Sequence, residues 1–120
     1  MELTRTLEFV PAPGEPAREI IVTIGEPEPD PEPGGDFRCR LVISGFEKPY
    51  DHHFHGVDPI QALINTLWIV PDAVGMLSGW KGRVTWLGTE GLGFRYGDRL
   101  SKESEDEPRA SAQPPETKGE

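Results

Sequence analysis

The sequence predicts an α+β domain in which an antiparallel sheet of four to six strands carries one main helix, at about residues 58–78, packed on one face. Two observations predict this class. Runs of alternating apolar and polar residues gather in the first half of the chain, and a single long stretch with helical periodicity follows them. Because the strands cluster before one helix, the strand–helix repeat of a parallel nucleotide-binding fold is absent.

The strand signals follow in order along the chain. Residues 2–10 and 18–25 alternate apolar and polar side chains and flank a short loop rich in Pro and Gly, which predicts a hairpin. Residues 37–45 give the clearest strand, with Cys39 on its apolar side as a small core residue. A shorter strand is expected over residues 82–88, and a short strand or a loop over residues 91–96. Residues 50–57 form either an edge strand or an irregular segment, and the sequence leaves this open.

Residues 26–33 alternate acid and proline without interruption. Proline fixes φ and lacks a backbone donor, and neighbouring carboxylates repel each other. The segment is therefore expected to be an extended, solvated spacer and not a strand of the sheet. At about 3.1 Å per residue it would reach roughly 25 Å.

One helix is expected between Asp58 and Gly79. Asp58 is a preferred N-cap residue, and Pro59 suits the first helical position because the donor it lacks has no helical partner there. Pro71 falls inside the pattern and is expected to kink or interrupt the helix just before it. Trp68 is expected in the core or at its edge. The apolar stripe that should face the sheet consists of Ile60, Leu63, Leu67, Val70, Val74 and Leu77.

Composition divides the chain into a folded body and a tail. The 120 residues include 21 acidic and 12 basic side chains, a net charge of −9, and only 35% of them are hydrophobic. Residues 101–120 contain no Val, Ile, Leu, Met, Cys or aromatic residue, so they bury too little apolar surface to offset the entropy of ordering. We expect a single α+β domain over residues 1–97 and a disordered acidic tail over residues 98–120.

The same composition argues against several classes of function. A strongly negative chain is not expected to bind nucleic-acid backbones or anionic membranes, both of which reward Lys and Arg. Cys39 is the only cysteine, so the chain forms no internal disulfide. The first ten residues lack the apolar core of a signal peptide, and polar residues interrupt the apolar stretch from Ile60 to Leu77. We therefore expect a cytoplasmic protein without a membrane span.

Three short segments carry a resemblance to known proteins. They are residues 56–63 (GVDPIQAL), which show a G-V-D-x-x-Q-A-L pattern at the helix entry, residues 34–39 (GGDFRC) and residues 85–88 (TWLG). Together they resemble a family of small bacterial proteins classified as a domain of unknown function, over about residues 3–95. The resemblance implies a compact cytoplasmic bacterial domain with no assigned reaction, and it brings no catalytic residue to this chain.

All three histidines lie in the segment Asp51-His52-His53-Phe54-His55. In an extended segment Asp51, His53 and His55 point to one side, as alternate ligands at strand spacing. Imidazoles with a carboxylate suit Zn²⁺ or Ni²⁺, and three ligands with an open position are typical of catalytic zinc. The favoured interpretation is nevertheless a polar edge strand with solvent-facing histidines and an inward Phe54. A surface that responds to pH is a further alternative.

No pattern in the sequence indicates catalysis. None of the serines lies in a G-x-S-x-G elbow, and the glycines between Gly88 and Gly93 do not lead into a helix as those of a phosphate-binding loop do. The acidic run over residues 26–33 lacks the ligand spacing of a calcium loop. We therefore expect no enzymatic activity and no cofactor, with Zn²⁺ at the histidine cluster as the alternative.

Two sets of residues are candidates for contact with a partner protein. Trp80 lies in a turn, where an exposed aromatic beside charged residues has the character of a binding hot spot, although the favoured interpretation is that it caps the core. Arg38 and Arg40 share one face of their strand and mark a polar binding face, unless they pair with carboxylates on other strands. Arg83 is expected to lie near these two arginines. The carboxylates that would pair with them across strands are those of Glu19 or Glu8.

These observations favour a non-enzymatic protein-interaction module that presents an acidic surface to a basic protein partner. An immunity-type or adaptor role fits this description by analogy. The alternative is a metal-binding function at His52, His53 and His55. Binding of a small ligand between helix and sheet is a third hypothesis, and the oligomeric state is left open.

A truncation tests the predicted tail. Deleting residues 98–120 should leave the melting temperature nearly unchanged, because residues that bury no apolar surface contribute little to stability. The measurement is thermal unfolding of the full and the shortened chain, followed by circular dichroism. A loss of several degrees would show that the tail packs on the body.

Overall fold

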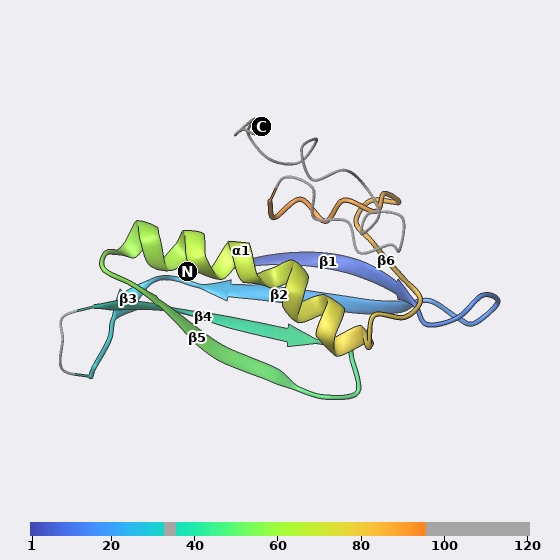
Figure 1. Cartoon of the computed structure of the whole chain (residues 1–120), viewed down its shortest axis with the longest axis horizontal. Helices are drawn as coiled ribbons and strands as arrows, with labels where there is room; N and C mark the ends of the chain where they lie inside the picture. The colour runs from blue at the N-terminus through green and yellow to red at the C-terminus, as the bar shows by residue number, and fades with distance from the viewer. Residues whose placement is uncertain (33–35, 96–120) are drawn as a thin grey trace, which may run out of the picture.

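The computed structural model describes residues 1–32 and 36–95 and shows a six-stranded antiparallel sheet with one long helix on one face (Figure 1). The α+β class expected from the sequence is confirmed. The predicted tail over residues 98–120 lies outside the described residues. The elements in chain order are β1 (Glu2–Val10), β2 (Arg18–Gly25), β3 (Glu28–Pro29), β4 (Phe37–Ser44), β5 (Tyr50–Gly56), α1 (Pro59–Ser78) and β6 (Arg83–Thr85).

Strand β4 organises the sheet. Along one edge it pairs with β5 from Phe37 to Ile43, and along the other it pairs with β2, from which the sheet continues through β1 to β6. The two residues of β3 pair with the start of β4, Glu28 with Arg38 and Pro29 with Phe37. The expectation that the acid–proline segment lies entirely outside the sheet was therefore wrong. Proline is tolerated at such a position because a two-residue strand makes few demands on its missing donor.

The alternation along the strands builds the core, as predicted. The β1–β2 hairpin pairs Leu7 with Ile20, and β4 places Cys39 fully buried on the same face of the sheet. Burial raises the pKa of the Cys39 thiol, an effect that a hydrogen bond with Thr66 partly opposes. Each large apolar side chain buried in this way stabilises the fold by about 1.5–3 kcal/mol. The buried strand residues are Leu7, Phe9, Ile20, Val22, Ile24, Cys39, Leu41, Ile43, Tyr50 and Val84.

Helix α1 begins and ends at the residues that the sequence indicated. The Asp58 carboxylate accepts a hydrogen bond from the backbone nitrogen of Gln61 at 2.8 Å, and Pro59 occupies the first helical position. At the other end Gly79 adopts a left-handed conformation with φ of 70°, and the Trp80 nitrogen donates to the Gly75 carbonyl at 2.9 Å. Together with the hydrogen bond from the Gly79 nitrogen to the Met76 carbonyl at 3.1 Å, this bond forms a Schellman motif. The motif satisfies carbonyl groups that have no helical donor in the last turn.

The inner face of α1 differs from the predicted one. Small and β-branched residues face the sheet, and they include Ala62, Thr66, Val70, Ala73 and Val74. Two expectations were wrong, because the side chain of Ile60 is 69% exposed and that of Trp68 is 58% exposed. The helix also runs through Pro71 without interruption. Its apolar residues occur on nearly all sides, so periodicity alone did not identify the side that packs against β4 and β5.

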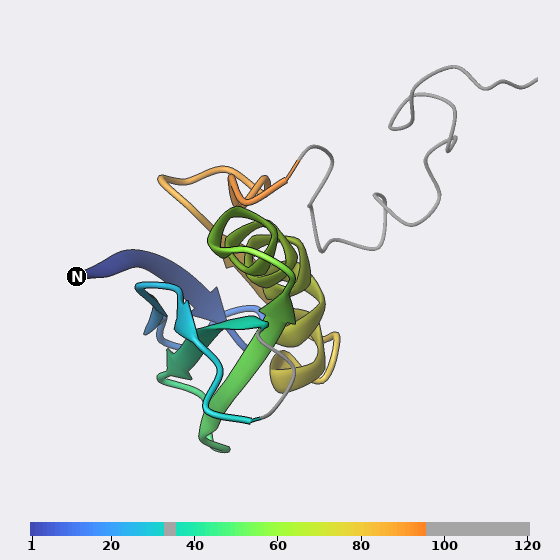
Figure 2. The same ribbon diagram turned by 90° about the vertical axis from the view of Figure 1, so that its left-hand side faces the viewer.

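The chain after α1 covers the part of the sheet that the helix leaves open. The strand expected over residues 82–88 is limited to Arg83–Thr85, and the described residues after it form turns and no strand. Arg5 on β1 lies between two rings of this segment, 3.8 Å from the centroid of Trp86 and 4.7 Å from that of Phe94. Trp86 is half-buried, at the edge of the core. Figures 1 and 2 show the helix and this segment together on one side of the sheet.

Helix α1 is also long and apolar enough to cross a membrane by length and composition alone, although 39% of the tested window is buried within the protein. The core helix of a soluble protein passes the same test.

The close approach of β5 to α1 gives a testable prediction. A Cβ atom added at Gly56 would lie 2.4 Å from the backbone nitrogen of Ala62, so Gly56→Ala must push the helix away from the sheet. We expect the free energy of unfolding to fall by about 1–3 kcal/mol. Urea denaturation measures it. The matched control is Gly25→Ala, whose Cβ would make only an ordinary contact at 3.6 Å with Arg40; an equal loss in both variants would contradict this account.

Candidate functional site

The candidate site lies on the face of the sheet that α1 does not cover (Figure 2). The pairing of β4 with β5 places Arg38 opposite His55 and Arg40 opposite His53, with Asp51 further along the same face. These five residues are called the polar face below. All five were predicted as one-sided sets on separate strands, and the structure brings the two sets together. A shallow depression beside them also includes Glu2, Glu26 and Glu28.

Both arginines of the polar face are paired with carboxylates. Arg40 binds Asp51 through two hydrogen bonds of 2.8 and 2.6 Å, and Arg38 Nε lies 2.8 Å from Glu28 Oε2. The hydrogen bond from Arg40 lowers the pKa of Asp51, and the same bond raises the pKa of Arg40. The pairs tie β5 and β3 to opposite edges of β4 in the same region.

The partners and neighbour predicted for these arginines were wrong. Glu8 and Glu19 face each other across β1 and β2. Extending the β2–β4 pairing by one residue places Gly25 of β2 beside Arg40. Glycine has no side chain that could pair with the arginine. The third arginine, Arg83, lies on β6 at the far edge of the sheet and pairs with Glu90 at 3.1 Å, so it does not join the polar face.

Asp30 holds the acid–proline segment against the sheet. Its side chain is only 10% exposed and lies 2.9 Å from His55 Nε2. The other carboxylate oxygen accepts from the Glu32 nitrogen at 3.0 Å, and the Asp30 nitrogen donates to the Asp36 carbonyl at 2.8 Å. His55 is tied to α1 in turn, because Asn65 Nδ2 donates to its carbonyl at 2.8 Å. A segment expected to be a solvated spacer is therefore held against the sheet at Asp30.

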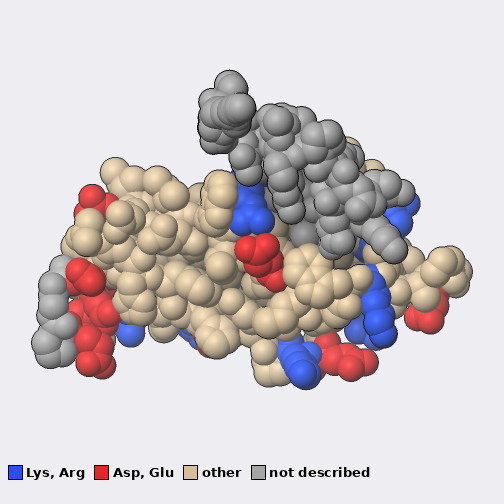
Figure 3. Space-filling view, in the orientation of Figure 1, with Lys and Arg blue, Asp and Glu red and all other residues tan. Residues whose placement is uncertain are grey.

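The same segment, together with Asp36 shortly after it, places five carboxylates at one end of the molecule. This acidic edge consists of Glu26, Glu28, Asp30, Glu32 and Asp36. Figure 3 shows acidic side chains concentrated at that end. Glu32 and Asp36 are exposed, whereas Glu28 and Asp30 are held by Arg38 and His55.

The structure divides the histidine cluster that was considered for a metal. His53 and His55 lie on the polar face, as expected from strand alternation, but His52 lies on the other face and packs on the Tyr50 ring at 4.5 Å. Asp51 is turned toward Arg40. Within residues 1–32 and 36–95 no three side chains of His, Cys, Asp or Glu converge as metal ligands. Phe54 faces the core, which agrees with the polar edge strand.

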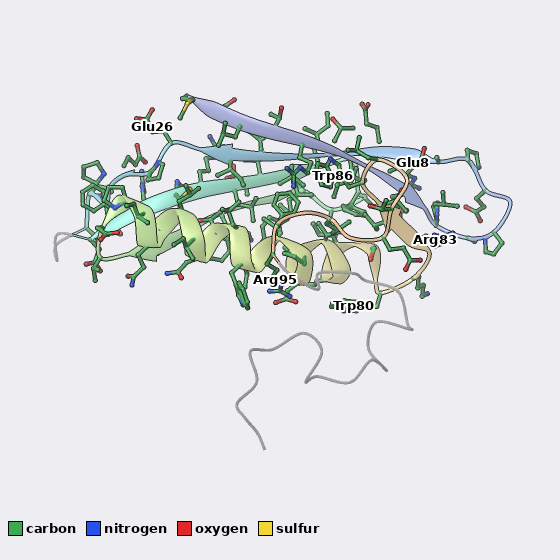
Figure 4. All side chains as sticks on the ribbon, turned by 90° about the horizontal axis from the view of Figure 1, so that it is seen from above. Glu8, Glu26, Trp80, Arg83, Trp86 and Arg95 are labelled. Atoms are coloured by element: carbon green, nitrogen blue, oxygen red, sulfur yellow. The ribbon has the colours of Figure 1, made fainter. Side chains whose placement is uncertain are left out.

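Trp80 is exposed, with 55% of its surface accessible, so the favoured expectation that it caps the core was wrong. Its ring lies directly over Gly75, where an added Cβ would come within 2.2 Å of it. Figure 4 places Trp80 on the side of α1 away from the sheet, far from Glu26 and the acidic edge. The two sets of candidate partner-binding residues therefore belong to different surfaces.

The surface around Trp80 was missed by sequence reasoning. Large apolar side chains, all more than half exposed, occur at four-residue steps along the outer face of α1, with Asp72 at one of the steps and the last side chain in the turn after the helix. The spacing itself was the available signal, but two of these residues, Ile60 and Trp68, were assigned to the core or its edge. This apolar stripe consists of Ile60, Ile64, Trp68, Met76 and Trp80.

A family model for the domain of unknown function DUF6968 matches residues 3–96. The chain belongs to this family, which agrees with the expected resemblance to a domain of unknown function. No curated protein and no solved structure matches the chain.

The ion pair on the polar face predicts a change in titration. Removing the guanidinium in Arg40→Ala should raise the pKa of Asp51 toward the ordinary carboxyl value near 4. In the native protein this lowered pKa favours folding above that value, and the contribution is lost as the pH falls. Titration of the Asp51 carboxyl carbon by NMR measures the shift. Arg38→Ala, which removes a cation paired with Glu28, is the control that should leave Asp51 unchanged.

Proposed function

We propose that this member of the family is a non-enzymatic protein-interaction module that presents its acidic edge to a basic partner protein. The observation that carries the proposal is the uneven distribution of charge. Five carboxylates gather along one end of the molecule, in a chain whose net charge is −9. Such a concentration of one sign accelerates encounter with a partner of the opposite sign and disfavours other partners.

The contacts of Asp30 support this proposal because they hold the acidic edge in one arrangement. A segment of alternating acid and proline in free solution would lose conformational entropy on binding. Here the contacts of Asp30 with His55, Glu32 and Asp36 fix its course before any partner arrives. A preorganised acidic surface suits an immunity-type inhibitor or an adaptor.

The open position of the polar face supports a binding role over a catalytic one. Its charged groups form ion pairs on a solvent-exposed sheet, where water weakens electrostatic interactions, whereas active sites gain strength by excluding water. Metal binding through His52, His53 and His55 with Asp51 remains the alternative function, and the same experiment tests it through a chelator.

The test is capture of partners from host lysate on the tagged full chain, with and without chelator. We expect a basic protein to be retained at low salt, to be released as salt rises, and to resist chelator. Neutralising the exposed part of the acidic edge, in Glu26→Gln/Glu32→Gln/Asp36→Asn, should reduce the retained amount at least several-fold.

The matched control neutralises three exposed carboxylates elsewhere, in Glu8→Gln/Glu15→Gln/Glu47→Gln. It makes the same change in net charge and should retain most of the partner. Equal loss in both variants would show that only net charge matters, which contradicts a specific acidic edge. Loss of the partner on adding chelator would instead favour the metal-binding alternative.

A further inference from the structure

The outer face of α1 is unusual for a helix on a protein surface. Its exposed residues include Ile60, Ile64, Trp68 and Met76, and Asp72 is the only charged residue in the whole helix. Exposed helix faces normally carry charged and polar side chains, and a helix that is apolar all round is normally covered all round. In Figure 3 this face appears as a broad area with little charge, where acidic and basic side chains meet near the middle.

The geometry of the apolar stripe suits packing against another helix. Residues four apart on an α-helix differ by about 40° in direction, so the stripe forms a ridge that runs obliquely across the outer face. Trp68 occupies its middle. Ridges of this kind on two helices interdigitate when the helices cross at about −50°, the most common packing class in globular proteins. Two identical ridges fit each other in this way around a twofold axis.

The charges at the middle of the stripe form a self-complementary pair. Arg95 Nη2 lies 3.2 Å from Asp72 Oδ1, and the guanidinium carbon lies 4.8 Å from the centroid of the Trp68 ring. Their charges cancel, so the stripe is neutral in a chain whose net charge is −9. A basic partner gains nothing here, whereas a second copy meets a neutral apolar surface. A twofold axis near Trp68 would also bring the Arg95 of each copy toward the Asp72 of the other.

The rest of the chain is a poor occupant for the stripe. Residues 96–120 contain only two large apolar side chains, Tyr96 and Leu100, and cannot match a ridge of five.

The size of the stripe suits a protein–protein interface. The stripe extends over about 30 Å, the length of a helix of 20 residues. Two half-exposed tryptophans alone offer roughly 200 Å² of the about 800 Å² that each partner buries in a standard interface.

We propose that two copies of this chain associate through their apolar stripes, α1 packing on α1 around a twofold axis near Trp68. This inference concerns a different surface from the acidic edge and does not depend on the proposed basic partner. The dimer leaves the acidic edge of each copy exposed.

Analytical ultracentrifugation of the full chain tests the proposal. We expect reversible dimers between about 5 and 500 µM, the range of a modest interface. Ile64→Lys places a charge in the stripe and should raise the dissociation constant at least tenfold, roughly the effect of losing a hot-spot residue. The matched control is Leu87→Lys, which adds the same charge at an exposed leucine away from α1 and should leave the dimer intact.

Ionic strength separates this proposal from the previous one. Screening relieves repulsion between two negative chains, so added salt should strengthen the dimer while it weakens capture of a basic partner. If Ile64→Lys unfolds the chain, Ile60→Lys provides the same test at a more exposed position.

The proposal is overturned if the native chain stays monomeric throughout the concentration range, or if Leu87→Lys dissociates the dimer as much as Ile64→Lys does. Co-sedimentation of the chain with phosphatidylcholine vesicles tests whether the stripe binds lipid. A monomer that binds these vesicles, and loses binding in Ile64→Lys, would identify lipid as the occupant of the stripe in place of a second copy.

Discussion

The close contact between the small inner face of α1 and strands β4 and β5 determines most of what the surface of this protein presents. Gly56 allows the chain to pass within van der Waals distance of Ala62, and the buried residues of the helix are small or β-branched. The larger apolar residues, such as Ile64 and Trp68, are therefore left on the outside. The apolar stripe is a consequence of how the core is packed, because a helix that is apolar on every side cannot bury all of its residues against one sheet.

The two proposed binding surfaces differ in their electrostatics and in their positions. The acidic edge is charged and lies at one end of the sheet, whereas the apolar stripe is neutral and lies on the outer face of α1. Two such surfaces on one small domain can be occupied at the same time. A dimer formed through the stripe would present two acidic edges, and a partner with two basic sites would then bind the second with a high effective concentration.

Much of the fold could be predicted because local signals determine it. Alternation identified the strands and their inward faces, and Asp58 and Gly79 identified the ends of the helix. The two-residue strand at Glu28–Pro29 could not be predicted, since it depends on Arg38 and on the contact between Asp30 and His55, which join distant parts of the chain. Strand alternation placed His53 and His55 on one side, but the carboxylate partners of the arginines depend on strand register, which no local pattern reveals.

The kink or interruption predicted at Pro71 does not occur, although the physical reason for expecting it is present. Proline has no donor for the carbonyl of Leu67, so the helix loses a hydrogen bond at this point. The helix nevertheless continues, and the Arg95 side chain donates to the neighbouring carbonyl of Trp68 while it pairs with Asp72. The proline therefore lies where the segment after β6 is fastened to the helix. Arg95 therefore connects this segment to the helix and also lies at the middle of the apolar stripe. Association of two copies through the stripe would then cover the contacts of Arg95 with Trp68 and Asp72.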